Sequence, residues 1–254
     1  MAINIFGIKD AANLTIKNKT DKKIFLYADY ATATTNEWTS ENVYAKSKNV
    51  NAIRWDYGKT GSLKLSFEIF DLKFLSMLAG SDFVTGATDI SVREVFTVST
   101  GNKITLGSTP KTGSLLIYTL DEDGLTNIKE QVLGTPASTQ DTYSISSLEV
   151  TLNATSCPVG SKVVAYYIKT STATAKTLTV NADKFSKNFE IVADTLIRAT
   201  DGDDQFVQIT YLNAKPKSNW SITMSASDIT TLEIEFDLLK DSSSSDMATY
   251  KIYE

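Results

Sequence analysis

The residue types that most often do chemistry in proteins are scarce in this chain of 254 residues, which has no histidine and one cysteine. Histidine is the commonest general base and the commonest side-chain ligand of transition metals. The single thiol, Cys157, has no histidine to activate it, and Pro158 directly after it indicates a loop. The composition therefore predicts a protein that is not an enzyme and that uses no cofactor.

Three short stretches have some features of ligand-binding loops, but each fits a turn better. Residues 107–114, Gly-Ser-Thr-Pro-Lys-Thr-Gly-Ser, lack the lysine that directly follows the second glycine of a phosphate loop. The acidic stretches 121–124 and 201–204 lack the ligand spacing and the terminal glutamate of a calcium loop. Among the other carboxylates, no two residues stand out as a glycosidase pair. We therefore predict no metal site and no catalytic site.

One acidic pattern is less ordinary. Residues 231–238, Thr-Leu-Glu-Ile-Glu-Phe-Asp-Leu, alternate as a strand does, with carboxylates on one face and apolar side chains on the other. A second predicted strand, at 189–198, also has acidic residues on its polar face. The acidic residues of the two strands are Glu233, Glu235, Asp237, Glu190 and Asp194. They form either a solvated outer face or an acidic wall past which a negatively charged polymer moves without binding.

The clearest local structure lies in residues 61–80, where the period of the hydrophobic residues changes. Alternation from Leu63 to Ile69 predicts a strand with one buried face. Helical spacing follows at residues 72–79, with Asp71 placed to cap the start and Gly80 to end the last turn. A helix this short is unstable alone in water, so we expect it to pack on a sheet.

The rest of the chain is predicted to be rich in strands. In its first and last parts, strands are expected at residues 24–30, 53–57, 189–198, 205–212, 220–226, 231–239 and 248–253. Residues 31–51 show no period and predict a long loop that contains Trp38, Val43 and Tyr44. Such residues either anchor a partner surface or fold back on their own core, and the sequence leaves both possibilities open.

The pattern changes between residues 92 and 170, where short apolar runs alternate with clusters of turn-forming residues. This spacing predicts a small β-sandwich, followed by a Thr-rich joint at residues 171–177. Residues 1–91 and 178–254 are then one domain into which the sandwich is inserted. The predicted fold is mainly β: packed, barrel-like sheets with one short α-helix, plus the inserted sandwich.

Net charge and hydropathy limit the kinds of partner that the protein is expected to bind. The net charge of −5 predicts that the protein as a whole repels nucleic acid. No apolar run approaches 18 residues, so we expect no membrane partner. The first residues lack the pattern of a signal peptide, and a single cysteine suits a reducing cytoplasm.

Several of these segments resemble bacteriophage tail tube (major tail) proteins over nearly the whole chain. The resemblance rests on the strand and helix at 62–79, the end of the sandwich at 161–167, and residues 189–198, 205–210 and 214–219. It implies hexameric rings that stack into a tube with a continuous, commonly electronegative lumenal barrel. DNA and the tape-measure protein would pass through this lumen without specific binding. Copies of the same chain and other tail proteins would be the partners.

The resemblance also implies roles for particular residues. By position, inter-ring contacts would come from the N-terminal arm at 1–12, the loop at 31–52 and an outward-facing helix. The residues concerned are Trp38, Val43 and Tyr44 in the loop and Asp71, Lys73 and Ser76 in the helix. The acidic residues would face the lumen, and the protein would be a virion tail component made in the host bacterial cytoplasm.

A second interpretation is a virion or surface adhesion protein whose β-sandwich binds carbohydrate or a host surface. Its sugar-stacking residues would be Tyr118, Tyr143, Tyr166 and Tyr167, which are equally compatible with a place in the core.

Overall fold

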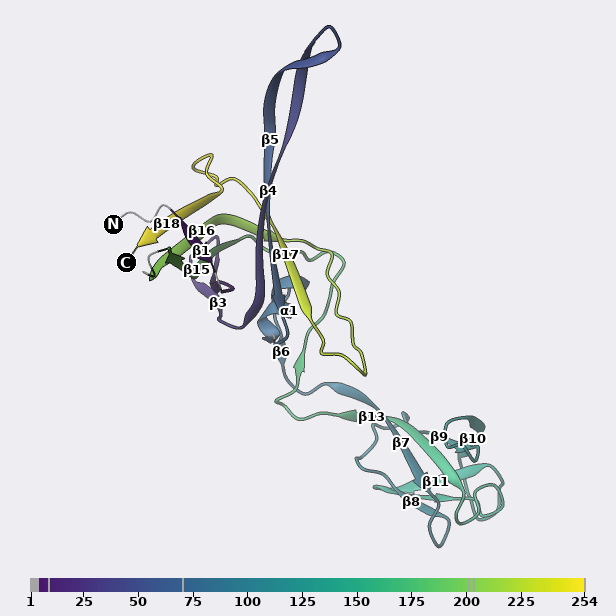
Figure 1. Ribbon diagram of the computed structural model, residues 1–254. Coiled ribbons are helices and arrows are strands. Elements are labelled where there is room, and N and C mark those ends of the chain that lie inside the picture. Colours follow the sequence, from purple (N-terminus) through teal and green to yellow (C-terminus); the bar gives the residue numbers. More distant parts are fainter. Residues whose placement is uncertain (1–4, 9, 70, 201, 203, 254) are drawn as a thin grey trace. The chain divides into compact units, whose positions relative to one another are not determined.

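The computed structural model describes residues 5–8, 10–69, 71–200, 202 and 204–253, and these are mainly β (Figure 1). The chain divides into two compact units. The first comprises the residues up to Phe83 and from Leu178 onward, and the second is Val84–Thr177. The second unit includes residues 84–91 and 171–177, because short strands β6 (Val84–Thr85) and β14 (Lys176–Thr177) pair there.

A nine-stranded antiparallel sheet forms the first unit. Its strands are β1 (Phe6–Ile8), β2 (Asn13–Asn18), β3 (Ile24–Ala28), β4 (Ala31–Ser47), β5 (Val50–Phe67), β15 (Phe189–Ala199), β16 (Asp204–Pro216), β17 (Leu232–Leu238) and β18 (Ala248–Tyr253). The order is β3-β2-β15-β16-β17-β5-β4, with β1 added to β15 and β18 to β16. The sheet curls into a nearly closed barrel, which confirms the predicted mainly β, barrel-like fold.

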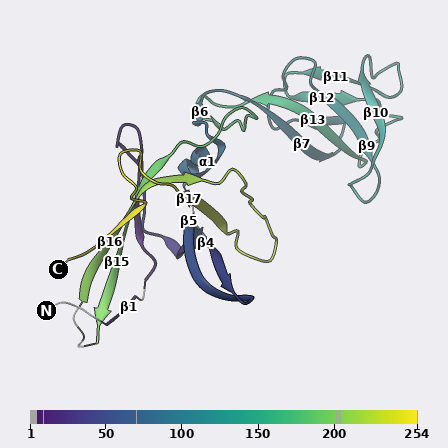
Figure 2. The same cartoon turned by 90° about the horizontal axis from the view of Figure 1, so that it is seen from above.

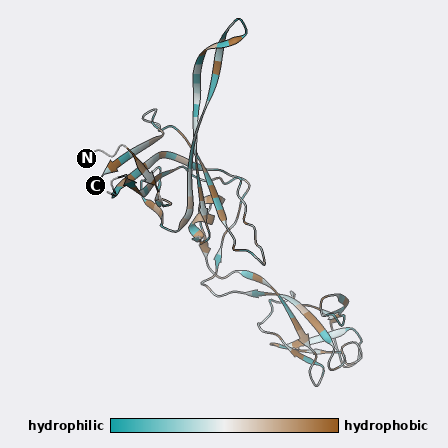
Figure 3. Ribbon diagram, viewed as in Figure 1, coloured by the Kyte–Doolittle hydropathy of each residue, from teal (hydrophilic) through white to brown (hydrophobic). Residues whose placement is uncertain are grey.

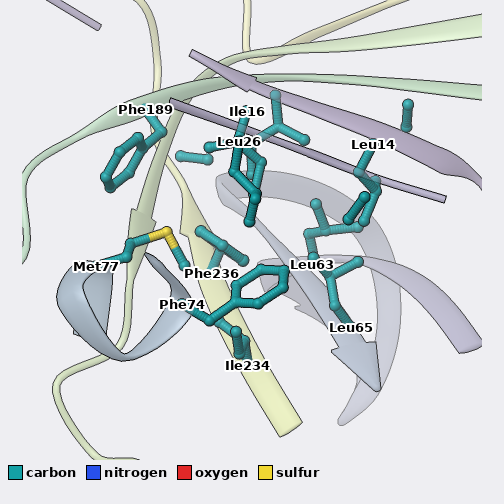
Figure 4. Close-up of a cluster of buried hydrophobic side chains, with 14 of the residues drawn as sticks. Leu14, Ile16, Leu26, Leu63, Leu65, Phe74, Met77, Phe189, Ile234 and Phe236 are labelled. Carbon is teal, nitrogen blue, oxygen red and sulfur yellow. The ribbon is translucent and has the colours of Figure 1, made fainter. Parts of the chain in front are cut away.

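The core of this unit lies on the concave side of the sheet. Leu63 and Leu65 of β5 are fully buried beside Phe236 of β17, as the alternation in both segments predicts. Helix α1 (Leu72–Ala79) covers this face, and Figure 4 shows Phe74 and Met77 directed from the helix into the cluster. Each such side chain contributes roughly 1.5–3 kcal/mol when fully buried.

The ends of α1 are those expected from the sequence. The side chain of Asp71 accepts a hydrogen bond from the Lys73 amide, and Gly80 adopts the left-handed conformation with φ 64°. The helical spacing of Leu72, Leu75, Leu78 and Ala79 predicts one apolar face, and Leu78 and Ala79 are indeed buried, whereas Leu72 is 44% exposed. Phe74 and Met77 are buried beside them. Ile69 is also exposed, since β5 ends at Phe67 and its alternation stops there.

The predicted long loop is wrong: residues 31–47 form strand β4, which pairs with β5 in a long hairpin. Its turn is Lys48–Asn49, and both residues have positive φ, as a two-residue type I′ turn requires. The distal half extends away from the rest of the first unit (Figure 1). Both faces of this half lack a core beneath them, so burial does not impose the alternation by which strands are recognised in a sequence.

The hairpin contains one irregularity that affects its faces. Thr39 pairs with Thr60 but Glu41 pairs with Tyr57, so β5 has one residue more than β4 between these pairs. Gly58, with φ 60°, lies in this β-bulge.

A second correction concerns residues 220–226, where the structure has no strand and only an isolated bridge between Ile222 and Leu232. Met224 is 85% exposed, so the short alternation does not mark a buried face. The predicted turn after residue 199 is confirmed by the hairpin of β15 and β16, although residues 201 and 203 lie outside the described ones.

The second unit holds a separate core. Its strands are β7 (Asp89–Thr97), β8 (Lys103–Thr105), β9 (Leu116–Leu120), β10 (Asn127–Leu133), β11 (Thr142–Ser146), β12 (Glu149–Leu152) and β13 (Lys162–Thr170). They follow the order β7-β13-β9-β10-β11-β12-β8, with a short parallel step from β10 to β11. Buried residues from both ends of this order, such as Val163 of β13 and Val150 of β12, belong to one cluster. Figure 2 shows this unit from a second direction.

Candidate assembly surfaces

The distal half of the β4–β5 hairpin carries an apolar face exposed to solvent. Cross-strand pairs join Val43 to Trp55 and Ala45 to Ile53, and Tyr57 follows on the same side. We call these five residues the apolar hairpin face. Four of them, all except Ala45, are 52–54% exposed. Figure 3 shows hydrophobic residues recurring along this part of the hairpin.

The opposite face of the same segment is polar. Asn42 pairs with Asp56 and Tyr44 with Arg54, and the Arg54 guanidinium forms an ion pair with Asp56 at 2.6 Å. The distal hairpin is therefore amphipathic although no core of its own unit lies beneath it. Two-stranded hairpins are at best marginally stable in water, and packing of one face against other protein stabilises them. This geometry suits contact with another polypeptide.

Trp38, predicted as a contact residue, packs on its own unit at the base of the hairpin. Its ring lies so close to Gly61 that a Cβ atom there would approach it to 2.5 Å. The indole Nε1 donates a hydrogen bond to the Tyr250 hydroxyl at 3.4 Å, and Lys59 Nζ lies 5.8 Å from the ring centroid. The contacts of Trp38 thus support the base of the hairpin. Val43 and Tyr44 are exposed, and their role in assembly stays a prediction.

The sequence contains a signal for the apolar hairpin face that the prediction of a loop at 31–51 does not use. Ile53, Trp55 and Tyr57 alternate, and this pattern predicts a strand at 53–57. The alternation is real, but the residues lie beyond the end of the core, and only the three-dimensional pairing of the hairpin places them in solvent.

The row of carboxylates on β17 is not a purely acidic face. Glu233 forms an ion pair with Lys64 of β5 at 2.8 Å. Lys217 bonds to Glu235 and lies 3.8 Å from Asp237. Basic residues from outside the strand thus lie beside each of its acidic residues. The sequence does not show that these lysines lie beside β17. The pattern of β17 alone therefore overstates the negative charge of this face.

The two acidic residues of β15 also have polar neighbours. Glu190 forms ion pairs with Lys22 and, at 3.7 Å, with Lys17. Burial raises the pKa of Glu190, but Lys22, Lys17 and the nearby Lys19 together outweigh this effect, so the pKa lies below its ordinary value. Asp194 accepts a hydrogen bond from Gln208 at 3.0 Å. Both acids therefore serve cross-strand pairing, and the polar face of the sheet has mixed charge.

The helix residues differ in their exposure. Ser76 is 8% exposed and lies on the packed side of α1, so the predicted outward contact is wrong for this residue. Asp71 and Lys73 are exposed, and Lys73 Nζ donates to the Phe25 carbonyl at 3.1 Å. Of the predicted N-terminal arm, residues 6–8 form β1 on the edge of β15, whereas residues 1–4 and 9 lie outside the described ones.

The buried thiol shows no sign of activation. Burial raises the pKa of Cys157 to about 11, and Asp141 adds to this shift. The thiol therefore stays neutral at physiological pH, which suits a packing role. Among the described residues, no three acidic or cysteine side chains gather as a metal site would need. No helix in that same part of the chain is long and apolar enough to cross a membrane.

No curated protein matches the chain. A family model described as YomU/Tube protein family matches residues 6–252 and so spans both compact units. This agrees with the resemblance to phage tail tube proteins seen in the sequence. The chain belongs to the YomU/Tube protein family.

Proposed function

We propose that this protein is a non-enzymatic structural protein of a phage tail, whose copies form rings that stack into a tube. Family membership supports the tail tube assignment, and the apolar hairpin face carries the proposal of self-assembly. The rings would be hexameric, as the sequence resemblance implies. The protein would be made in the host bacterial cytoplasm and would act in the virion tail.

A second copy of the chain is the partner that best fits the hairpin. Repeated contacts between two different patches of one chain generate closed rings or open filaments, which are the two geometries that a tube needs. Strand β4 also has β5 as its one neighbour within the described residues, so its other edge offers unpaired backbone groups. Such edges pair readily with another chain. An exposed apolar face and an open edge on one projecting element favour a contact between subunits.

The mixed charge of the sheet's polar face suits a passage for DNA. Proteins hold DNA chiefly through basic side chains that neutralise phosphates and release counterions. Here Lys64 and Lys217 already bond to Glu233 and Glu235, so they offer little net positive charge to a phosphate. We propose that this face lines the lumen and lets DNA and the tape-measure protein pass without binding.

Negative-stain electron microscopy of the purified protein tests the assembly. We expect rings or tubes from the wild type and folded monomers from the double variant Val43→Ser/Trp55→Ser, because buried interface residues contribute about 2 kcal/mol or more. Loss of that energy weakens each contact about 30-fold. Circular dichroism verifies that the variant is folded.

The matched control is Asn42→Ser/Arg54→Ser, which changes two residues on the opposite face of the same hairpin. It should assemble as the wild type does. Dispersed wild-type monomers at high concentration, or normal tubes from Val43→Ser/Trp55→Ser, would remove the hairpin from the proposed interface.

A further inference from the structure

The outward face of one sheet in the second unit carries two tyrosines in contact. Along β13, Val163, Ala165 and Tyr167 turn to the core, so Tyr166 turns outward. Tyr166 pairs with Arg93 on one side and Leu116 on the other. Tyr118 lies beside it on β9, opposite the outward-facing Val164. We call Arg93, Leu116, Tyr118 and Tyr166 the tyrosine shelf.

Contacts within the shelf hold its rings in place. The centroids of Tyr118 and Tyr166 lie 6.2 Å apart in an edge-to-face arrangement. The Arg93 guanidinium lies 5.9 Å from the Tyr166 centroid, and its Nε donates to the Tyr166 hydroxyl at 3.3 Å. That hydroxyl also donates a hydrogen bond to Asn127 Oδ1 at 3.4 Å. Val164 has no exposed surface, so the side chains around it fill the floor of the shelf.

The other two tyrosines of this unit belong to the core. Tyr143 donates to the Leu115 carbonyl at 3.0 Å, and Tyr167 donates to the Glu94 carboxylate at 2.9 Å. Both are less than 7% exposed. Of the four tyrosines that sequence reasoning considered for sugar stacking, only the shelf pair is accessible.

We propose that the tyrosine shelf binds a glycan, an activity separate from tube assembly. Aromatic rings stack on the C–H faces of sugars, while neighbouring polar groups hydrogen-bond to the sugar hydroxyls. Arg93, Asn127 and Glu130 offer donors and acceptors around the rings, and Glu130 pairs directly opposite Tyr118. The aliphatic residues Val95 and Leu116, each 43–46% exposed, extend the apolar strip at the margin.

A protein partner fits the shelf less well. Stable protein interfaces use about 20–30 residues on each side, with an apolar centre depleted of charge. Val132, which is 53% exposed, continues the apolar strip along β10, but charged side chains such as Arg93 and Glu130 lie among the rings of the shelf. This mixture matches a ligand in which C–H faces and hydroxyl groups alternate over a few ångströms.

A retention assay with the full-length protein tests the proposal. The probes are insoluble bacterial peptidoglycan sacculi and a panel of immobilised bacterial surface polysaccharides. We expect the wild type to bind at least one of these probes and Tyr118→Ala/Tyr166→Ala, which removes both rings, to lose at least about 10-fold in affinity, equivalent to about 1.4 kcal/mol. Leu133→Ala, which changes an exposed residue of β10 outside the shelf, is the matched control and should bind normally.

Folding of the second unit is monitored independently through the protection of buried Cys157 from a thiol reagent. If the double alanine variant loses this protection, Arg93→Gln/Tyr166→Phe serves instead, because it removes polar groups and keeps both rings. Binding should also persist in Val43→Ser/Trp55→Ser, so a failure of tube assembly is distinguishable from a failure of glycan binding. No retention on any glycan, or undiminished retention of the folded shelf variants, would overturn the proposal. So would retention that depends on protein rather than on glycan in the probe.

Discussion

At the residue scale, Gly80 combines two requirements that no other residue type meets. Its φ of 64° lies in the left-handed region, and an added Cβ atom would approach the Phe185 backbone to 2.6 Å. The left-handed conformation alone costs a residue with a Cβ atom roughly 1–2 kcal/mol. A backbone clash cannot be relieved by moving a flexible side chain, so its cost adds to the first.

We therefore predict that Gly80→Ala destabilises the first unit by more than about 2 kcal/mol. Gly58→Ala is the control, because Gly58 has φ 60° in the same unit but its Cβ atom would approach nothing closer than 4.0 Å. It should cost only the conformational term. Urea unfolding followed by tryptophan fluorescence measures the first unit alone, since all three tryptophans, Trp38, Trp55 and Trp220, lie in it. Equal destabilisation by both variants would mean that the Phe185 contact is unimportant.

At the scale of elements, the ladder from β16 through β17 to β5 depends in part on cross-strand charge. The hydrogen bond from Lys217 to Glu235 raises the lysine's pKa, and Asp237 adds to the shift. A raised pKa means that the contribution is present at neutral pH and is lost as the pH rises above about 10.5. Exposed pairs of this kind contribute about 0.2–1 kcal/mol.

Lys217→Gln should accordingly lower the free energy of unfolding by about 0.2–1 kcal/mol at low ionic strength. The difference from wild type should shrink in about 1 M salt, where the screening length is about 3 Å. Lys215→Gln is the control, because Lys215 lies in the same segment and has no ion pair among the described residues. A loss that salt leaves unchanged would indicate packing of the lysine stem rather than charge.

Elements whose apolar residues enter a core could be predicted from the sequence. The strand ending at Phe67, the caps of α1 and the strand at Leu232–Leu238 all follow from burial on one face and from local hydrogen bonding. Strand β4 could not be predicted, because no core of its own unit lies beneath its distal part and only Val43 and Ala45 mark an apolar side there, which is too short a pattern to identify a strand. The ion pairs at Lys64 and Lys217 could not be predicted either, since they depend on the register of β17 against β5, which is far away in the sequence, and against β16.

At the scale of the whole molecule, the two units have separate cores with no residue in common. The ends of the second unit also meet, because Val84 and Thr177 are paired in the ribbon of β6 and β14. Phe83 and Leu178, the next residues outward, are therefore brought close together. A short linker between them should leave the sheet of the first unit intact.

We predict that replacing residues 84–177 with a short Gly-Ser linker leaves a protein that unfolds cooperatively at nearly the wild-type urea concentration. Tryptophan fluorescence gives the midpoint, because the replaced segment contains no tryptophan. Tube formation by the shortened chain would show in addition that assembly needs only the first unit. A broad, non-cooperative transition would contradict the independence of the two cores.

The extra residue in β5 at Gly58 reverses the phase of the strand. By parity in the sequence, the β5 members of the apolar hairpin face belong with Leu63 and Leu65, so an unbroken strand would turn them all to the core side. The bulge sets them instead on the side of Ser62 and Lys64. The side of the hairpin on which the β5 part of the apolar hairpin face lies is thus determined by the number of residues between Tyr57 and Leu63. The types of the residues in that face do not determine it. Strand β4 has no extra residue here, so Val43 and Ala45 lie on that side by simple alternation, and the bulge in β5 is what brings Ile53, Trp55 and Tyr57 to the same side.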